Sequence, residues 1–186
     1  MKKVIIFSLV IFISGIHLPA QNNSAMDVLL NHYSPRVFGS GSVTRAELDQ
    51  IILAGIRAPS AMNGQPWHFT VVQNEALARQ LVPQTSAGNV LILVSAIGDG
   101  LTNGPEILDC AIAIHSMYLA AQALGLGSRV YTNPVAGINS RFRTQLGLPD
   151  DHNVIAVIRI GRLPPVVDAG SSASPRHNPD RVVTYR

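Results

Sequence analysis

Apolar residues recur along the chain in two kinds of pattern, one typical of helices and the other typical of buried strands. Helical spacing predicts helices over 25–33, from Thr44 to about residue 56, over 75–82, over 105–124 and over 139–146. Short apolar or β-branched runs predict strands over 69–73, 90–97, 128–131 and 154–161, with strand-like residues again over 181–185. This mixed order without an internal repeat indicates an α+β fold, in which a sheet core is flanked by helices.

Local signals support two of the predicted helices. Thr44 and Glu47 form the Thr-x-x-Glu pattern of a capping box, which satisfies backbone donors at a helix start. Pro105 and Gly125 bracket the longest predicted helix, at the ends where proline and glycine are favoured. Because this helix is apolar nearly all round, we expect it to be buried on most sides, and a dimer interface would explain that burial.

The first twenty residues follow the three-part pattern of a secretory signal. Lys2 and Lys3 precede an apolar run over 4–16, and Ala20 offers a small residue before a cut. The run is short for a transmembrane span, although an uncleaved anchor or a buried N-terminal helix are the alternatives. We therefore expect a signal peptide over 1–20, a mature domain over 21–186, and an exported, periplasmic protein with no stable membrane anchor after cleavage.

Composition narrows the range of functions. The formal net charge of the 186 residues is +3, and removal of Lys2 and Lys3 with the signal leaves +1, so the charge gives no reason to expect nucleic acid binding. Cys110 is the one cysteine, which excludes an intrachain disulfide. The six histidines show no metal-ligand spacing, and no metal site is predicted.

One loop concentrates polar groups between a predicted helix and a predicted strand. Residues 57–69 read Arg-Ala-Pro-Ser-Ala-Met-Asn-Gly-Gln-Pro-Trp-His-Phe and gather Ser60, Asn63 and Gln65. Such groups need hydrogen-bond partners when they are buried, and a flat ring with polar edges could supply them. Trp67 is interpreted as a packing residue.

Two further segments carry candidate anion-binding groups. The segment His32-Tyr33-Ser34-Pro35-Arg36-Val37-Phe38 follows the first predicted helix, and the guanidinium of Arg36 suits a phosphate. A helix-ending loop with a surface arginine is the alternative. Arg176 lies in a basic C-terminal segment, for which a disordered tail is the alternative.

These segments together resemble the nitroreductase family of flavin mononucleotide (FMN) enzymes. Residues 57–69 resemble its A-P-S-x-x-N-x-Q-P-W segment, and residues 32–38 resemble its R-R-S-x-R-x-F phosphate motif. Ser34, Arg36 and Phe38 match that motif, whereas His32 and Tyr33 stand where the family often has two basic residues. The likeness runs from about residue 28 to 185.

The resemblance implies a set of cofactor contacts. The FMN phosphate would be held near the first helix and by a basic residue near the C-terminus, and the ring would lie at a subunit boundary. Gln65 would order the loop. The residues implied for the site are His32, Tyr33, Ser34, Arg36, Pro59, Ser60, Ala61, Asn63, Gln65, Asp109, Val130, Tyr131, Thr132 and Arg176.

The resemblance also implies a fold and an activity. We expect a mainly antiparallel sheet flanked by helices, in an intertwined homodimer whose C-terminal strand joins the partner's sheet. The expected activity is FMN-dependent, ping-pong reduction of nitro, quinone or related small compounds, with NAD(P)H or another donor. No side chain is assigned as acid or base. A flavin-dependent dehydrogenase or oxidase, and a flavin- or ligand-binding module without turnover, are the alternatives.

Overall fold

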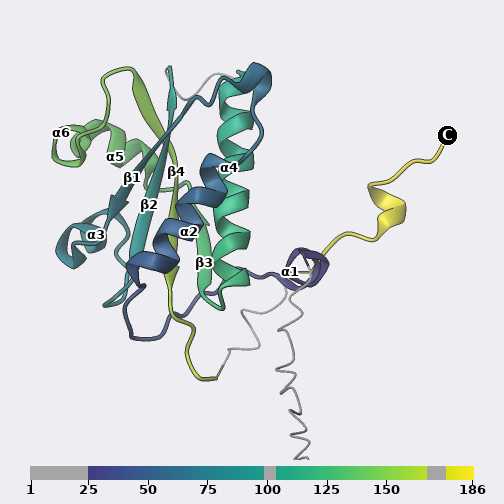
Figure 1. The fold of residues 1–186 in the computed structure, drawn as a ribbon, viewed down its shortest axis with the longest axis horizontal. Helices are drawn as coiled ribbons and strands as arrows, with labels where there is room; N and C mark the ends of the chain where they lie inside the picture. The colour runs from purple at the N-terminus through teal and green to yellow at the C-terminus, as the bar shows by residue number, and fades with distance from the viewer. Residues whose placement is uncertain (1–24, 99–103, 167–174) are drawn as a thin grey trace, which may run out of the picture.

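The computed structural model describes residues 25–98, 104–166 and 175–186, so the predicted signal peptide lies outside it. Within these residues, four strands form one antiparallel sheet with the order β1-β2-β4-β3 (Figure 1). The strands are β1 (Trp67–Val72), β2 (Val90–Ile97), β3 (Gly127–Tyr131) and β4 (His152–Gly161). The expected mainly antiparallel sheet is therefore confirmed.

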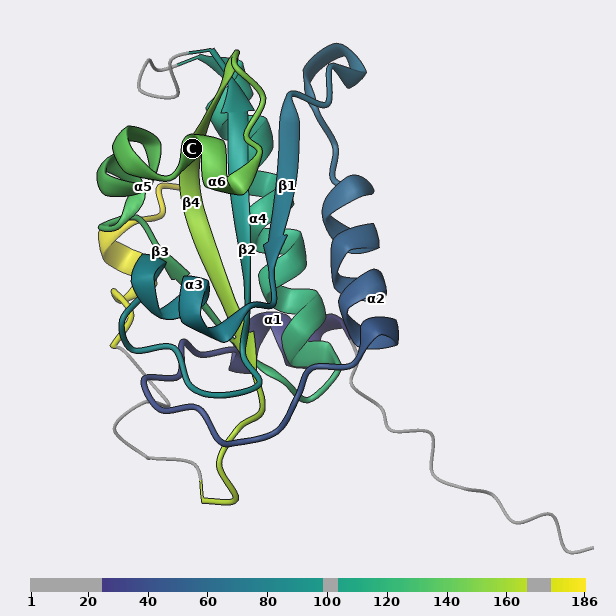
Figure 2. The ribbon, with the colours of Figure 1, turned by 90° about the vertical axis from the view of Figure 1, so that its left-hand side faces the viewer.

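Helices cover both faces of this sheet. Figures 1 and 2 show α2 and α4 on one face and α3, α5 and α6 on the other. The helices are α1 (Ala25–Asn31), α2 (Arg45–Ile56), α3 (Glu75–Leu81), α4 (Pro105–Ala123), α5 (Val135–Arg141) and α6 (Arg143–Leu146), with single 3₁₀ turns at η1 (Ala61–Asn63) and η2 (Pro179–Arg181). The expected arrangement of a sheet flanked by helices is also confirmed.

Strand β2 supplies the centre of the core because its side chains alternate between the two faces. Ile92 and Val94 belong to the apolar cluster under α2 and α4, whereas Leu91 and Leu93 belong to the cluster under α3, α5 and α6. All four side chains are fully buried. A continuous apolar run over 90–97 therefore reads correctly as a central strand.

The capping box at the start of α2 forms as predicted. The Thr44 side chain accepts a hydrogen bond from the Glu47 backbone N–H at 3.2 Å, and the Glu47 carboxylate accepts from the Thr44 backbone N–H at 2.8 Å. Arg162 donates to both oxygens of the same carboxylate at 2.7 and 2.8 Å. The start of α2 is thereby tied to the end of β4.

Helix α4 is buried along the face that packs on the sheet and on α2. Its buried residues include Asp109, Cys110 and Met117, while Leu108 on the opposite side is 64% exposed. The sequence predicts a helix buried on most sides, whereas the described chain buries only the face that meets the sheet and α2. The exposed stripe is left for other contacts.

Two sequence-based predictions differ from the structure. The helix predicted over 139–146 begins instead at Val135, after Pro134, and is interrupted at Phe142, so α5 and α6 are separate. The residues over 181–185 do not form a strand; Arg181 ends the 3₁₀ turn η2, the others follow it, and all are exposed. A strand needs a neighbour to accept its backbone hydrogen bonds, and the described residues of one protomer offer this segment none.

Among the described residues, no helix is both long enough and apolar enough to cross a membrane.

Candidate functional site

Half of the sequence-predicted site residues line two separate pockets of the chain. The first, here called the Ser34 pocket, has a volume of about 360 Å³ and is lined by His32, Ser34, Ala111, Ile114, His115, Tyr118, Val130 and Arg176. It lies where the segment after α1, the outer side of α4 and the strand β3 meet. Its size is at the lower end of the range of about 300 to 1,000 Å³ for small-molecule sites.

The polar groups of the Ser34 pocket are held by local contacts. The Ser34 hydroxyl and the Tyr118 phenol lie 3.2 Å apart, within hydrogen-bond distance. His32 Nδ1 lies 2.7 Å from the Leu29 carbonyl oxygen, and a carbonyl only accepts, so this nitrogen carries the proton. The His32 ring also makes edge contacts with the rings of Tyr118 and His115, at centroid distances of 5.5 and 6.0 Å.

Gln122 on α4 fixes the backbone of the segment that carries Ser34. Its side-chain oxygen accepts from the Tyr33 N–H at 3.2 Å, and its Nε2 donates to the Tyr33 carbonyl at 2.9 Å and to the Ser128 hydroxyl at 3.0 Å. Burial raises the pKa of the Tyr33 phenol, and the neighbouring Tyr118 raises it further. Tyr33 therefore packs as a neutral side chain, and its backbone positions Ser34.

The second pocket, here called the Gln65 pocket, has a volume of about 390 Å³. The 57–69 loop contributes one wall, and the ends of β2, α4 and β4 contribute the others. Its lining residues are Ala61, Met62, Gly64, Gln65, Pro66, Ile97, Pro105, Glu106, Asp109 and His152. Three of the residues predicted from the sequence, Ala61, Gln65 and Asp109, thus share one pocket.

The backbone of the 57–69 loop is strained. Met62, Asn63 and Gln65 have positive φ angles of 50°, 57° and 47°, in the left-handed region that non-glycine residues rarely adopt. The Ser60 hydroxyl accepts from the Gln65 N–H at 3.1 Å, and the Gln65 side chain donates to the Asn63 side-chain oxygen at 3.3 Å. Strain of this kind persists where surrounding contacts hold it, and it is concentrated at ligand-binding sites.

Asp109 is the contact that ties the loop to α4. Both of its carboxylate oxygens lie 3.1 Å from the backbone nitrogen of Ala61, which donates to them, and the residue is only 6% exposed. Next to it, burial raises the pKa of the Cys110 thiol to about 12, and the charge of Asp109 raises it further. The thiol is therefore protonated and unreactive at neutral pH.

The remaining predicted residues line neither pocket. These are Tyr33, Arg36, Pro59, Ser60, Asn63, Tyr131 and Thr132. Ser60 and Asn63 act within the loop itself, as described above. Trp67 packs as expected, because its ring stacks on Phe69 at a centroid distance of 6.2 Å.

The structure adds residues that sequence reasoning missed. His152 reaches the Gln65 pocket, and its Nδ1 lies 2.8 Å from the Asp151 carboxylate. This hydrogen bond lowers the pKa of Asp151. His115 and Tyr118 line the Ser34 pocket from α4. They are three residues apart, a spacing that places two side chains on the same face of a helix, and this is the one sequence signal that could have predicted them as neighbours.

The donors of the Ser34 pocket fit an anionic group. A hydroxyl, a guanidinium and two imidazole rings line it, which is the chemistry that recognises a phosphate. The Gln65 pocket instead offers one side-chain amide, two carboxylates and the His152 ring. In the part of the chain that the structure describes, no three His, Cys, Asp or Glu side chains are grouped to hold a metal ion.

Comparisons with known proteins agree with this geometry. The model of the nitroreductase family matches residues 29–90 and 88–162. A protein of Archaeoglobus fulgidus, provisionally named NADH dehydrogenase/NAD(P)H nitroreductase, is 29% identical over 168 residues, which cover 84% of this chain and 95% of the relative.

Solved structures show the same fold. A nitroreductase with bound FMN from Desulfitobacterium hafniense superposes with a TM-score of 0.70 at 25% identity, covering 88% of this chain and 98% of the other. A nitroreductase with bound FMN from Bacteroides fragilis superposes with a TM-score of 0.65 at 23% identity, covering 83% of this chain and all of the other. The match therefore extends over nearly the whole length of these chains.

Proposed function

The chain belongs to the nitroreductase family, and we propose that it is an FMN-dependent oxidoreductase that reduces nitro compounds, quinones or related small oxidised compounds. Two findings together support the proposal. The chain aligns over most of its length with FMN-bound nitroreductases, and its own Ser34 pocket holds the donors that a phosphate requires.

The residues of the Ser34 pocket would hold the phosphate end of the cofactor. Ser34 offers a hydroxyl, Arg176 a permanent positive charge, and His32 a ring nitrogen. Arg36, two residues after Ser34, is assigned to the same phosphate by its place in the family motif. When bound, FMN supplies the two-electron chemistry, and the protein supplies binding, orientation and electrostatics.

The 57–69 loop would supply the second set of contacts. Asp109 and Ser60 hold its strained backbone in one conformation before any ligand arrives. A preformed loop loses less conformational entropy on binding than a loop that must first order itself. The residues Pro59, Ser60, Ala61 and Asn63 are assigned to the cofactor on this basis and by the family motif, with Gln65 ordering the loop.

A homodimer would bring the two sets of contacts together. In one protomer they belong to different pockets, and the cofactor would have to bridge them across a subunit boundary. Exposed apolar side chains support this assembly, since Leu30, Leu108 and Val182 are 74%, 64% and 65% exposed. Val130, Tyr131 and Thr132, at the end of β3, would then pass beside the ring.

Export remains a proposal that the N-terminal pattern supports. A signal peptide over 1–20 would place the mature protein in the periplasm, where NAD(P)H is not the natural donor. A different reductant would then serve it. Expression of the full chain in a Gram-negative host, followed by mass spectrometry of the N-terminus, tests this: a mature start at Gln21 in the periplasmic fraction supports export, and an intact Met1 in the cytoplasm contradicts it.

Reconstitution of the mature chain with FMN tests the main proposal. We expect a yellow protein. Its bound FMN should be reduced by NADH or another biological electron donor, and should be reoxidised by a nitroarene or a quinone. A protein that remains colourless after reconstitution contradicts the proposal. Bound FMN that neither donor nor acceptor can turn over would indicate a binding module, and oxidation of a reduced substrate would indicate a dehydrogenase or oxidase.

A further inference from the structure

Phe38 occupies a slot in the sheet that two glycines create. Gly127 on β3 and Gly161 on β4 are register partners, and the Phe38 ring lies against both. A Cβ atom at Gly127 would lie 3.0 Å from the Phe38 ring, and one at Gly161 would lie 2.9 Å from it. The ring is consequently only 6% exposed, and larger residues at either glycine would collide with it.

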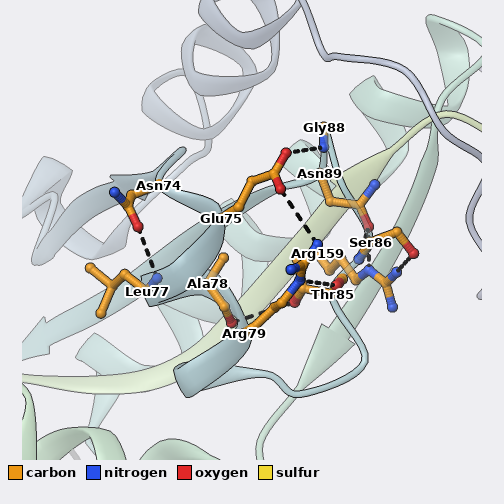
Figure 3. A network of polar contacts seen from close by, with 10 residues as sticks. All are labelled: Asn74, Glu75, Leu77, Ala78, Arg79, Thr85, Ser86, Gly88, Asn89 and Arg159. Atoms are coloured by element: carbon orange, nitrogen blue, oxygen red, sulfur yellow. Dashed lines mark hydrogen bonds and ion pairs between the residues drawn. The ribbon is translucent and has the colours of Figure 1, made fainter.

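The guanidinium of Arg159 closes this slot. Its Cζ lies 4.0 Å from the centroid of the Phe38 ring, within the distance of a cation–π contact. Its Nε donates to the Asn89 side-chain oxygen at 2.7 Å, and one terminal nitrogen donates to the Ser86 hydroxyl at 3.1 Å (Figure 3). A planar guanidinium can make these edge and face contacts at once, which a lysine cannot.

The acceptors of Arg159 are themselves anchored to α3. Figure 3 shows Glu75 accepting from the Gly88 N–H, at 3.2 Å, and Arg79 donating to the Thr85 carbonyl, at 3.4 Å. The Thr85 hydroxyl in turn donates to the Val82 carbonyl at 2.6 Å. The loop over 85–89 is thus fixed at both sides, and it presents a rigid pair of acceptors to the buried guanidinium.

Burial of the Arg159 guanidinium costs desolvation free energy, and neutral hydrogen-bond partners offset only part of that cost. Arg159 is 1% exposed, and the hydrogen-bond partners described above are neutral. A buried charge of this kind is weak evidence for a contribution to stability. Burial lowers the pKa of Arg159, while the neighbouring Tyr131 phenol opposes that shift. We therefore expect Arg159 to fix the positions of the groups that it contacts rather than to stabilise the fold.

What Arg159 fixes is the end of the phosphate-binding segment. Phe38 lies two residues after Arg36 and four after Ser34. Arg129, the register partner of Arg159, lies 3.4 Å from the Pro35 carbonyl and donates to it, so the same segment is held at a second point. We infer that Arg159 is a positioning residue for the phosphate end of FMN, acting through Phe38 on Ser34 and Arg36.

This inference rests on the proposed function, and riboflavin separates the two. Riboflavin has the ring and ribityl chain of FMN but not the phosphate. Dissociation constants for both ligands are measured by flavin fluorescence for the wild type, Arg159→Met, Arg159→Lys and Phe38→Leu. We expect Arg159→Met and Phe38→Leu to weaken FMN binding about tenfold or more while riboflavin binding changes less than about twofold. Arg159→Lys should lie between, because it keeps the charge but loses the planar contacts.

A matched control separates positioning from general destabilisation. Val157→Ala alters a fully buried residue of the same strand, in the cluster under α3. It should lower the unfolding temperature without changing the ratio of the FMN and riboflavin constants. If the wild type prefers FMN but both Arg159→Met and Phe38→Leu keep the wild-type ratio, the inference is overturned and the proposed function stands. If the wild type binds no FMN, the proposed function fails and the inference fails with it. Should Arg159→Met not fold, Phe38→Leu and Arg159→Lys decide the question.

Discussion

His32 uses one ring nitrogen within its own segment, and this limits what the ring can offer a phosphate. Nδ1 donates to the Leu29 carbonyl, so in the neutral ring Nε2 is an acceptor. The imidazolium, in contrast, donates from both nitrogens.

We therefore predict that the His32 ring contributes to the preference for FMN over riboflavin. His32→Gln should reduce this preference by a few-fold at a fixed pH, because the ring lines the pocket assigned to the phosphate. Paired binding measurements with FMN and riboflavin test it, with His68→Gln as the control. An unchanged preference in His32→Gln would contradict the prediction.

Asp109 leads to a prediction about the loop. Hydrogen bonds to a charged group contribute about 1.5–3 kcal/mol, so Asp109→Ala should lower the free energy of unfolding by about that amount. It should also expose the 57–69 loop to proteases, because the Ala61 N–H loses its acceptor. Asp109→Asn should recover part of the loss. Urea denaturation and limited proteolysis provide the measurement.

Glu106→Gln is the matched control for Asp109. Glu106 lines the same pocket one turn earlier on α4. Its substitution should leave the free energy of unfolding and the protease pattern nearly unchanged. A loop that stays protected in Asp109→Ala would mean that other contacts hold it.

At the scale of the element, the start of α2 depends on one carboxylate. Hydrogen bonds from Arg162 are the main reason that the pKa of Glu47 falls from 4.5 to about 2, and contacts with Thr44 lower it further. Because the folded-state pKa lies below the ordinary value, the stabilisation is complete above about pH 4.5 and is lost as the pH falls through about 2.

Glu47→Gln should therefore lose stability at neutral pH and converge with the wild type in acid. Thermal unfolding at several pH values between about 2 and 7 measures the difference. Asp49→Asn is the control, since Asp49 lies on the same helix in an exposed ion pair with Arg45. A wild-type advantage that persists unchanged at pH 2 would contradict this assignment.

Elements were predictable where neighbouring residues set their limits. The capping box of Thr44 and Glu47 and the apolar run of β2 are examples. The helix predicted over 139–146 is wrong at its start because the initiating signal is Pro134, and helix-like spacing alone does not place a first turn. Contacts between distant segments were not predictable in this way: Gln122 meets Tyr33 across 89 residues, and Arg159 meets Phe38 where Gly127 and Gly161 leave room for its ring.

At the scale of the whole molecule, the C-terminal segment is the part that one protomer does not explain. Residues 175–186 are exposed throughout, and they include Val182, Val183 and Tyr185 at 65%, 44% and 94% exposure. Figure 1 shows this segment beginning beside α1 and then extending away from the sheet. Such side chains stay exposed at a cost in free energy unless a second copy covers them.

We predict that this segment stabilises the dimer. The double variant Val182→Asp and Val183→Asp should shift the protein toward monomer and weaken FMN binding, because charges are costly in an apolar interface. Sedimentation velocity with detection at the flavin band measures both effects, and Thr184→Asp, which adds charge beside the two valines, is the control. A wild-type protein that sediments as a monomer would contradict the proposed assembly.

The left-handed residues of the 57–69 loop have a consequence for engineering. Met62, Asn63 and Gln65 hold conformations that glycine adopts without the steric cost of a Cβ atom, although glycine loses more conformational entropy on folding. Directed evolution for heat resistance alone would be expected to enrich glycine where the relief of steric strain exceeds this entropic cost. The resulting proteins would unfold at a higher temperature but would lose the rigidity of the surface that faces the ligand. Thermostability screens on this scaffold therefore need a parallel selection for flavin retention.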